Sequence, residues 1–539
     1  GDVAHPASAS ASGTREKRTM RDQRAGTVPD RSRPASGVLP GASCRGEASR
    51  ATHRRGRVPI DRRADLGHPD TLLALPPDFL FGCATSAYQI EGGIENDWTA
   101  WERAGRLLRP DARCGAATDH WNRYESDFDL LASIGANAYR FSVEWSRVEP
   151  EPDRWDVAAI DRYVDMVRAL RRRDIEPVVT FLHFAHPKWV HDSCPWQEEA
   201  STAPDRFARF VERMMRAFGT RVRWFTIINE PMVWLLGGYL TGVSPPGHAG
   251  LRELFFASQA LVRGYLAARD VIRRRQPSAR CGIAHNVVRF EPDRPNDLGD
   301  RTMTRAAARF YNWAIPEVLT SGRLSVGLFP GLRYTTQITG AEGSMDFLGV
   351  NYYTRVYLRF DPLRRSGGRG IDAVYEDRSE LGVTDLGWEI HPAGLYDALR
   401  EMSGFGVPLM VSENGLDDRD DSRRARFLYD HLEAALSARR DGVDLLGYLH
   451  WSLLDNFEWL EGFEPRFGLF RVDYGTKART PTSGAELFSE IARTGRLSDQ
   501  RPPIRVKHGG RTPVLPGAPS TPRALLSGGP VDDHAVDSD

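Results

Sequence analysis

The sequence predicts an α/β protein built as a single (β/α)8 TIM barrel with disordered N- and C-terminal tails. Short apolar runs alternate with amphipathic stretches, which is the pattern of a parallel sheet covered by helices. Eight such units are the number that closes a barrel, and most of the runs end on polar or aromatic residues, as expected where all strand ends meet on one rim. The runs span residues 79–87, 137–145, 177–184, 224–230, 280–288, 345–354, 408–413 and 445–451.

The stretches between these runs carry the periodicity of surface helices. Residues 160–172 and 204–218 are the clearest examples, because apolar side chains recur there every three or four positions. A barrel of this type takes about 250 to more than 400 residues. The chain of 539 residues therefore has room for one barrel and two tails.

Composition divides the chain into three parts. Residues 1–70 are rich in Ala, Ser, Gly, Pro and Arg and poor in aromatic side chains, so they cannot bury enough surface to offset the entropy of ordering. We expect this segment to be disordered. A targeting or anion-binding role for its arginines is the alternative, which interspersed acids such as Asp22 and Asp61 weaken. Residues 71–497 form the barrel, and residues 498–539 are expected to be a second disordered tail.

The charge balance limits the possible partners, and the cysteine content indicates whether disulfides are expected. The 72 Lys and Arg residues balance 72 Asp and Glu residues, so no overall field favours nucleic acid or an anionic membrane. The five cysteines, Cys44, Cys83, Cys114, Cys194 and Cys281, include no C-x-x-C pair, and their odd number argues against a disulfide framework. Neither a membrane span nor the apolar core of a signal peptide is recognisable. We expect a cytoplasmic protein with a small, uncharged ligand; its oligomeric state is left open.

Two carboxylates stand out at the ends of predicted strands. Glu230 closes the run TIINE and is followed by Pro231, and Glu413 closes VSE and is followed by Asn414-Gly415. A carboxylate at the end of a buried strand must be paired or take part in chemistry. Because parallel strand ends share one rim, the two carboxyl groups can face each other there. A pair of carboxyl groups is the smallest set of catalytic residues that hydrolyses a glycosidic bond. The alternative is that both carboxylates belong to a buried structural network of ion pairs.

Other strand ends add polar and aromatic side chains to this rim. On a regular strand Asn351 and Tyr353 share a face. His183, His186 and His191 lack the i, i+4 spacing and the clustered acid of a zinc-protease site, so we expect no metal and no cofactor. The rim residues at the ends of the runs are Gln89, Arg140, Glu144, His183, Asn229, Asn351, Tyr353 and Trp451.

Five motifs, in this order along residues 75–492, resemble glycoside hydrolase family 1, the β-glucosidases. They are FLFGCATSAYQIEG at 79–92, YRFS at 139–142, NEP at 229–231, SENG at 412–415 and the run 451–459. Segments 143–147 (VEWSR) and 244–247 (SPPG) are closer to the archaeal-type branch of the family, since serine usually occupies position 144 elsewhere. The chain departs from the common pattern at Phe184 and Ala185, where Trp and Asp are usual.

The resemblance implies a role for each rim residue. By similarity, Glu230 is the general acid/base and Glu413 the nucleophile of a retaining double displacement, with the carboxyl groups about 5 to 5.5 Å apart. Arg140 and Tyr353 resemble the residues that hold the nucleophile. The resemblance also implies a set of substrate-binding residues: Gln89, His183, Asn229, Asn351, Trp451, Glu458, Trp459 and Phe467.

Three functions follow from this resemblance. The first is a retaining β-glycosidase acting on β-D-glucosides, or on related galactosides and fucosides; the others are a transglycosidase of the same fold and a catalytically silent carbohydrate-binding relative. Intact Glu230 and Glu413 argue against the silent relative. Glu458 would repel a sugar phosphate, so an unphosphorylated sugar is favoured. For Glu144, a structural partner for a cation such as Arg147 is favoured over a wall of the site that holds the leaving part of the substrate.

Overall fold

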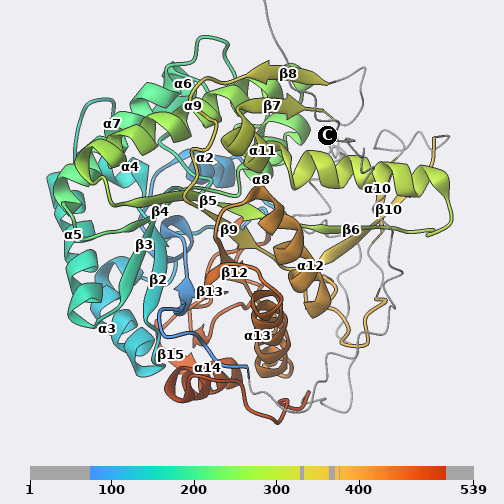
Figure 1. Ribbon diagram of the computed structural model, residues 1–539. Coiled ribbons are helices and arrows are strands. Elements are labelled where there is room, and N and C mark those ends of the chain that lie inside the picture. The colour runs from blue at the N-terminus through green and yellow to red at the C-terminus, as the bar shows by residue number, and fades with distance from the viewer. Residues whose placement is uncertain (1–72, 328–332, 363–370, 375–376, 505–539) are drawn as a thin grey trace, which may run out of the picture. The chain divides into compact units, whose positions relative to one another are not determined.

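The eight predicted runs form a closed barrel of parallel strands (Figure 1). The computed structural model describes residues 73–504 except 328–332, 363–370 and 375–376. The strands pair in the order β1-β13-β12-β9-β5-β4-β3-β2. Each strand overlaps one predicted run, which confirms the predicted fold class. Their bounds are β1 Leu80–Ala84, β2 Ala138–Ser142, β3 Glu176–Leu182, β4 Trp224–Asn229, β5 Arg280–Asn286, β9 Phe347–Asn351, β12 Leu409–Asn414 and β13 Leu445–Trp451.

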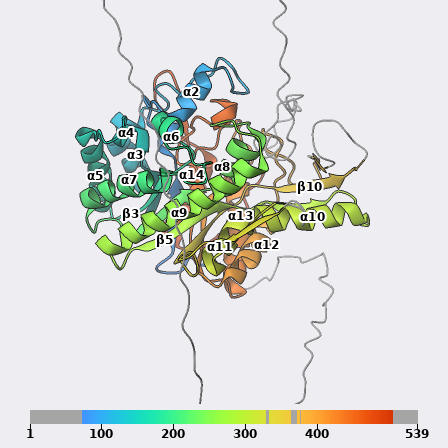
Figure 2. The ribbon, with the colours of Figure 1, turned by 90° about the horizontal axis from the view of Figure 1, so that it is seen from above.

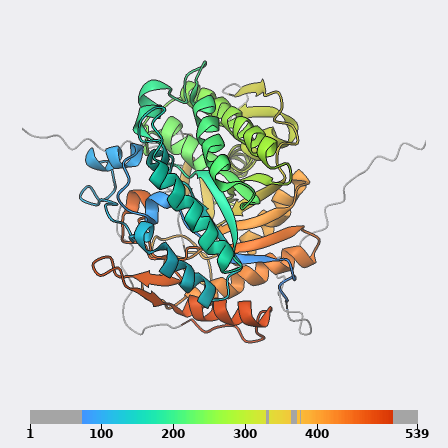
Figure 3. The same cartoon turned by 90° about the vertical axis from the view of Figure 1, so that its left-hand side faces the viewer.

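Long helices cover the outside of the barrel. In Figure 1, α3, α5, α7 and α9 lie on one side of the strands, and α12, α13 and α14 lie on the other; Figure 3 shows the green and teal helices of the first group packed side by side. Helices α5 and α7 confirm the two predicted amphipathic stretches. The long helices are α3 His120–Ser133, α5 Val157–Arg172, α7 Ala203–Phe218, α9 Leu251–Arg275, α10 Leu298–Tyr311, α12 Pro392–Met402, α13 Arg424–Arg440 and α14 Ser483–Thr494.

Short elements extend the loops that join strands to helices. The three-stranded sheet β11-β10-β6 packs against α10 beside the barrel (Figures 1 and 2), while β7–β8 and β14–β15 are hairpins. These strands are β6 Arg289–Pro292, β7 Arg323–Val326, β8 Tyr334–Gln337, β10 Arg355–Phe360, β11 Ile371–Val374, β14 Phe470–Val472 and β15 Arg479–Pro481. The short helices are α1 Ala87–Ile90, α2 Asp97–Arg103, α4 Trp145–Val148, α6 Lys188–Ser193, α8 Pro231–Leu235, the π-helical turn Leu236–Thr241, α11 Ala314–Ser321 and the 3-10 turns Ser403–Phe405 and Trp459–Glu461.

Side chains fill the inside of the barrel. Trp224 and Phe347, at the first positions of β4 and β9, meet edge to face with ring centroids 5.4 Å apart. Small residues such as Ala84 and Ala138 leave room for them, so large and small side chains interlock. The barrel is therefore a packed core, and a ligand site is possible only above it, where the strands end.

The described residues include only part of the expected C-terminal tail and four of the five cysteines. The expected N-terminal tail, 1–70, lies outside them, as do Cys44 and residues 505–539. Residues 498–504 form no helix or strand, yet Tyr429 of α13 donates a hydrogen bond of 2.7 Å to the carbonyl of Ser498. The four described cysteines are free and buried. None of the helices in the described part is long and apolar enough to cross a membrane, and the cytoplasmic location stays a prediction.

Candidate active site

A pocket with about 720 Å³ of empty space, including the open solvent at its mouth, lies at the end of the barrel where the strands finish. Nine of the twelve predicted site residues lie on its wall. The other three, Gln89, Arg140 and Asn351, lie behind the wall and bond to residues on it. The wall comprises His183, Phe184, Asn229, Glu230, Val233, Asn286, Val287, Val288, Tyr311, Tyr353, Thr354, Trp388, Glu413, Trp451, Glu458, Trp459 and Phe467.

Glu413, near the end of β12, is held by two donors. The guanidinium of Arg140, from β2, donates to Oε1 of Glu413, and the hydroxyl of Tyr353 donates to Oε2 over 2.7 Å. Arg140 is fully buried and also donates to Asn229 Oδ1 over 2.6 Å and to the hydroxyls of Thr180 and Thr226. Both carboxylate oxygens of Glu413 are thus bonded, one of them to a permanent cation.

Glu230 follows β4 and has a different environment. Its Oε1 accepts hydrogen bonds from the side-chain amides of Asn351 at 2.8 Å and Asn286 at 3.2 Å. No arginine or lysine lies on the described pocket wall, and Glu230 forms no ion pair among the described residues. Its backbone has φ +42°, in the left-handed region, and Phe184 (+67°) and Trp459 (+45°) on the same wall share this feature. Such backbone conformations cost about 1 to 3 kcal/mol each and cluster at active sites.

These environments affect the two carboxyl groups differently. Burial, and then the neighbouring charge of Glu413, raise the pKa of Glu230 to about 8. Burial also raises the pKa of Glu413, but Arg140 and Tyr353 oppose this rise by stabilising the ionised form. When one proton is shared between the two groups, it therefore resides on Glu230.

One side of the pocket combines amides, a carboxyl group and aromatic rings. Nε2 of Gln89 donates to Glu458 Oε2 at 3.1 Å and to Asn456 Oδ1 at 2.9 Å. The ring of His183 is nearly parallel to both Trp451 and Trp459, with centroids 5.9 and 6.1 Å away. A polar edge over an apolar floor suits a ligand with hydroxyl groups at its rim and C–H groups on its faces.

The orientation of the Asn229 side chain determines which ring nitrogen of His183 carries the hydrogen. Because arginine only donates, Asn229 presents its oxygen to Arg140 and its amide N–H to His183 Nε2, 3.1 Å away. Burial and the charge of Arg140 lower the pKa of His183 well below its usual value, so the ring is neutral. Its hydrogen is thus on Nδ1, an atom without a hydrogen-bond partner in the described part of the chain.

Glycine allows the ends of two strands to approach. Gly415, the last residue of the SENG motif, directly follows β12, and a Cβ atom there would lie 1.7 Å from the carbonyl oxygen of Trp451, at the end of β13. Any other residue would push these strand ends apart. Glu413 and Trp451 therefore share one wall because position 415 carries no side chain.

Comparisons with known proteins decide the family. Residues 72–496 match the profile described as glycosyl hydrolase family 1. The chain belongs to this family. This family 1 hydrolase is 30% identical over 453 residues to the 1,4-beta-D-glucan glucohydrolase of Thermotoga neapolitana, covering 79% of the chain and 99% of the relative. It is 31% identical to beta-glucosidase A of Acetivibrio thermocellus, covering 78% and 98%. The solved beta-glycosidase from Pyrococcus horikoshii has a TM-score of 0.73 and 35% identity, covering 80% and 97%.

Eight of the seventeen wall residues of this family 1 hydrolase are not among the predicted site residues, and Asn286, Tyr311 and Trp388 are three of them. Asn286 is the last residue of β5, so the rule that polar strand ends form the rim could have identified it. Tyr311 ends α10 and bonds to Asn286 Oδ1 over 2.8 Å, and Trp388 lies on a loop. Neither Tyr311 nor Trp388 follows a strand of the barrel, and no sequence signal marks them.

Glu144 lies outside the pocket wall. Among the described residues Arg147 forms no direct ion pair with it, although the nearby charge of Arg147 opposes the rise in the pKa of Glu144 that burial causes. The strand β2 ends at Ser142, so Glu144 does not continue its alternation but immediately precedes α4. The buried carboxylate accepts hydrogen bonds from Asn96 at 3.3 Å and Ser146 at 2.6 Å. Arg147, the cation expected to pair with it, instead pairs with Glu91 at 3.0 Å.

No metal centre is recognisable in the part of the chain that the structure describes. No three His, Cys, Asp or Glu side chains there are grouped so that they could hold an ion. His186, from the predicted histidine trio, instead lies 3.7 Å from Asp97.

Proposed function

We propose that this family 1 hydrolase is a retaining β-glycosidase that cleaves β-D-glucosides through a covalent glycosyl-enzyme. The observation that carries the proposal is the pair of buried carboxyl groups in one pocket with unequal surroundings. Glu413 has an arginine and a phenol on its oxygens, while Glu230 has only amides. Unequal environments of this kind separate an acid from a nucleophile at one pH.

In the first step Glu413 attacks the anomeric carbon. Its carboxylate oxygen forms a bond to that carbon while the bond to the leaving oxygen breaks, and Glu230 gives its proton to that oxygen. Glu230 is then ionised. In the second step it removes a proton from water, the resulting oxygen attacks the anomeric carbon from the opposite face, and Glu413 leaves as a carboxylate. Two inversions retain the β configuration.

The wall of the pocket supports an uncharged glucose unit as the bound sugar. Glu458, which Gln89 holds from behind the wall, offers carboxyl oxygens to sugar hydroxyls, and Trp451 offers a face for C–H groups. A sugar phosphate would meet Glu230, Glu413 and Glu458 with no cation on the described wall. The names of two relatives, a 1,4-beta-D-glucan glucohydrolase and a beta-glucosidase, agree with glucose as the bound sugar. The 35% identity to the Pyrococcus beta-glycosidase supports the proposal that this chain is close to the archaeal-type branch of the family.

Azide rescue tests the roles of the two carboxyl groups. Glu413→Ala should lose turnover of an aryl β-glucoside, and added azide should restore it with an α-glucosyl azide product, because the anion enters the space of the nucleophile. Glu230→Ala should give the β-azide instead. Swapped products would reverse the assignments. The same assay with an added alcohol separates hydrolysis from transglycosylation, since only a transglycosidase yields mainly the alkyl glucoside.

A further inference from the structure

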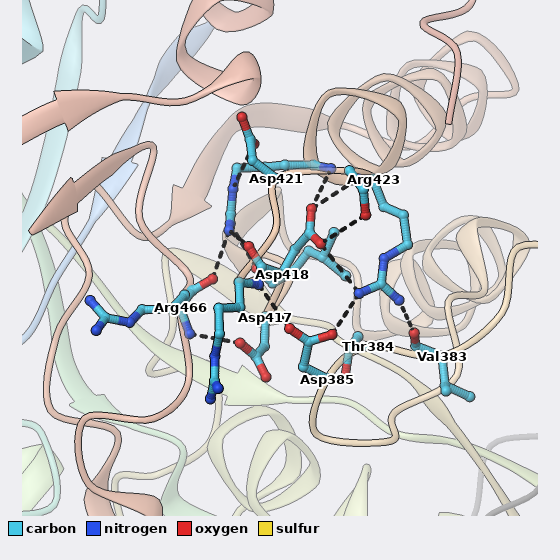
Figure 4. A network of polar contacts seen from close by, with 12 residues as sticks. Val383, Thr384, Asp385, Asp417, Asp418, Asp421, Arg423 and Arg466 are labelled. Atoms are coloured by element: carbon cyan, nitrogen blue, oxygen red, sulfur yellow. Dashed lines mark hydrogen bonds and ion pairs between the residues drawn. The ribbon is translucent and has the colours of Figure 1, made fainter. Parts of the chain in front are cut away.

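A network of charged side chains ties together three loops behind the pocket (Figure 4). Arg423, directly before α13, bonds to two of these loops. One nitrogen of its guanidinium donates to Asp385 Oδ1 at 2.7 Å and lies 3.2 Å from Asp418 Oδ1, and another donates to the carbonyl of Val383. Asp418 is fully buried and also accepts from the backbone N–H of Arg423 at 2.9 Å. The loop after β12 is thereby joined to the segment 383–389.

The third loop joins through its backbone. The N–H of Arg466 donates to Asp417 Oδ1 at 2.6 Å, and the N–H of Asp418 donates to the carbonyl of Arg466 at 3.1 Å. In Figure 4 the Arg466 guanidinium points away from the network, so the main chain makes this link. The next residue, Phe467, lies on the pocket wall.

The segment held by Arg423 carries Trp388 into the pocket. Val383 and Glu389 form a β-bridge, and within it the N–H of Thr384 donates to the carbonyl of Trp388 at 2.8 Å. A displacement of Val383 or of Asp385 would therefore also displace Trp388. The other end of this segment is anchored separately, since Glu389 bonds to Arg355 at 2.9 Å.

Trp388 in turn packs on the phenol that bonds to the proposed nucleophile. Its ring meets Tyr353 edge to face, with centroids 5.6 Å apart, and lies 6.0 Å from Phe467. Tyr353 donates to Glu413 over 2.7 Å. Contacts therefore join every step from Arg423 through the segment 383–389, Trp388 and Tyr353 to Glu413.

We propose that Arg423 is a positioning residue that holds Trp388 against Tyr353 and thereby sets the activity of the site. It is outside the pocket wall and touches no reacting group. Arginine suits the task because its planar fork donates in several directions at once, which a lysine ammonium on a flexible stem does less well. The inference rests on the proposed function, since it concerns the same pocket.

The chain provides a matched control on the same helix. Arg426 pairs with Asp430 at 2.7 Å and has a side-chain exposure of 23%, against 21% for Arg423. The pair Arg426–Asp430 lies within α13 and includes no contact to the segment 383–389. Arg423→Gln removes the ion pairs with Asp385 and Asp418, and Arg426→Gln removes the pair with Asp430, but only the first substitution releases Trp388.

A double-substitution experiment tests the proposal. Arg423→Gln should lower kcat/KM for an aryl β-glucoside on the order of tenfold, because small misplacements in a catalytic site have effects of this size or larger. Arg426→Gln should leave kcat/KM unchanged. In a Trp388→Ala background, adding Arg423→Gln should produce no further loss, since Arg423 acts through Trp388. Arg423→Lys should give an intermediate loss, and it serves as the second variant if Arg423→Gln does not fold.

Two results would overturn the inference. One is an equal kcat/KM for Arg423→Gln and Arg426→Gln at matched melting temperatures. The other is a loss from Arg423→Gln that is the same with Trp388 present and absent, which would indicate a general structural role. Failure of the wild-type enzyme to cleave the glucoside would instead contradict the proposed function, so the two failures are distinguishable.

Discussion

Replacing Glu230 with Gln should remove the alkaline limb of the pH dependence of kcat/KM. Burial and the charge of Glu413 raise the pKa of Glu230 to about 8. Because the first step needs the protonated acid, wild-type activity should fall as pH rises through about 8. At pH 6 a carboxyl group of pKa 4.5 is about 3% protonated, whereas one of pKa about 8 is about 99% protonated. The pocket therefore retains roughly thirty times more of the acid form than a free glutamic acid would.

The assay compares two aryl β-glucosides that differ in their need for acid assistance. A phenyl glucoside has a basic leaving oxygen that needs a proton, and a dinitrophenyl glucoside does not. For the phenyl glucoside, Glu230→Gln should lower kcat/KM by about 10² to 10⁴ and give a profile without the limb near pH 8. For the dinitrophenyl glucoside, the effect on formation of the glycosyl-enzyme should be much smaller.

Persistence of the alkaline limb in Glu230→Gln would refute this reasoning. The limb would then belong to another group, and the raised pKa of Glu230 would have no part in catalysis. An equal loss for both glucosides would also contradict a role in protonating the leaving group, because only one of them requires it. The stability of each variant at each pH is the control.

Four further outcomes are expected. Tyr353→Phe removes a hydrogen bond that favours ionised Glu413, so the acidic limb of kcat/KM should move to higher pH. Since the pKa of Glu230 is about 8 when folded and 4.5 as a free group, wild-type stability should fall as pH rises between these values, and the melting temperature of Glu230→Gln should fall less over the same range, because Asp97 and Asp417 with pKa values of about 7 still contribute. Glu144→Ser should lower stability by about 1 to 3 kcal/mol by leaving its donors unpaired, while the kcat/KM ratio between a disaccharide and an aryl glucoside stays unchanged. Glu458→Ser should weaken glucoside turnover and raise the relative rate on a 6-phosphoglucoside; a wild type that prefers the phosphorylated sugar would contradict the assignment.

Strand ends explain why much of the site could be predicted from sequence. Glu230, Glu413 and Trp451 lie where buried apolar runs stop, and parallel strands bring those points onto one rim. Asn286, the last residue of β5, obeys the same rule. Local pattern and barrel topology together thus determine which side chains share the pocket.

The remaining features depend on contacts that no local pattern encodes. Trp388 enters the pocket through a bridge and a charged network that join segments far apart in the chain. Glu144 was expected to follow strand alternation, but α4 begins at Trp145 and redirects it. Tertiary packing decides both cases, and strand periodicity applies only as far as the strand extends.

Arg140 bonds to strands that are far apart in the sequence, so its contacts in the site can be completed only late in folding. This side chain starts on β2 and bonds to residues on β3, β4 and β12, and its contact with Glu413 joins positions 273 residues apart. Between β2 and β12 the barrel order places β1 and β13, whose sequences lie at opposite ends of the fold. Glu413 therefore acquires its cation only after the last strands have joined the first, and contacts of such sequence separation form slowly. In refolding experiments, glucosidase activity should return later than helical circular dichroism, so that turnover reports closure of the ring of strands.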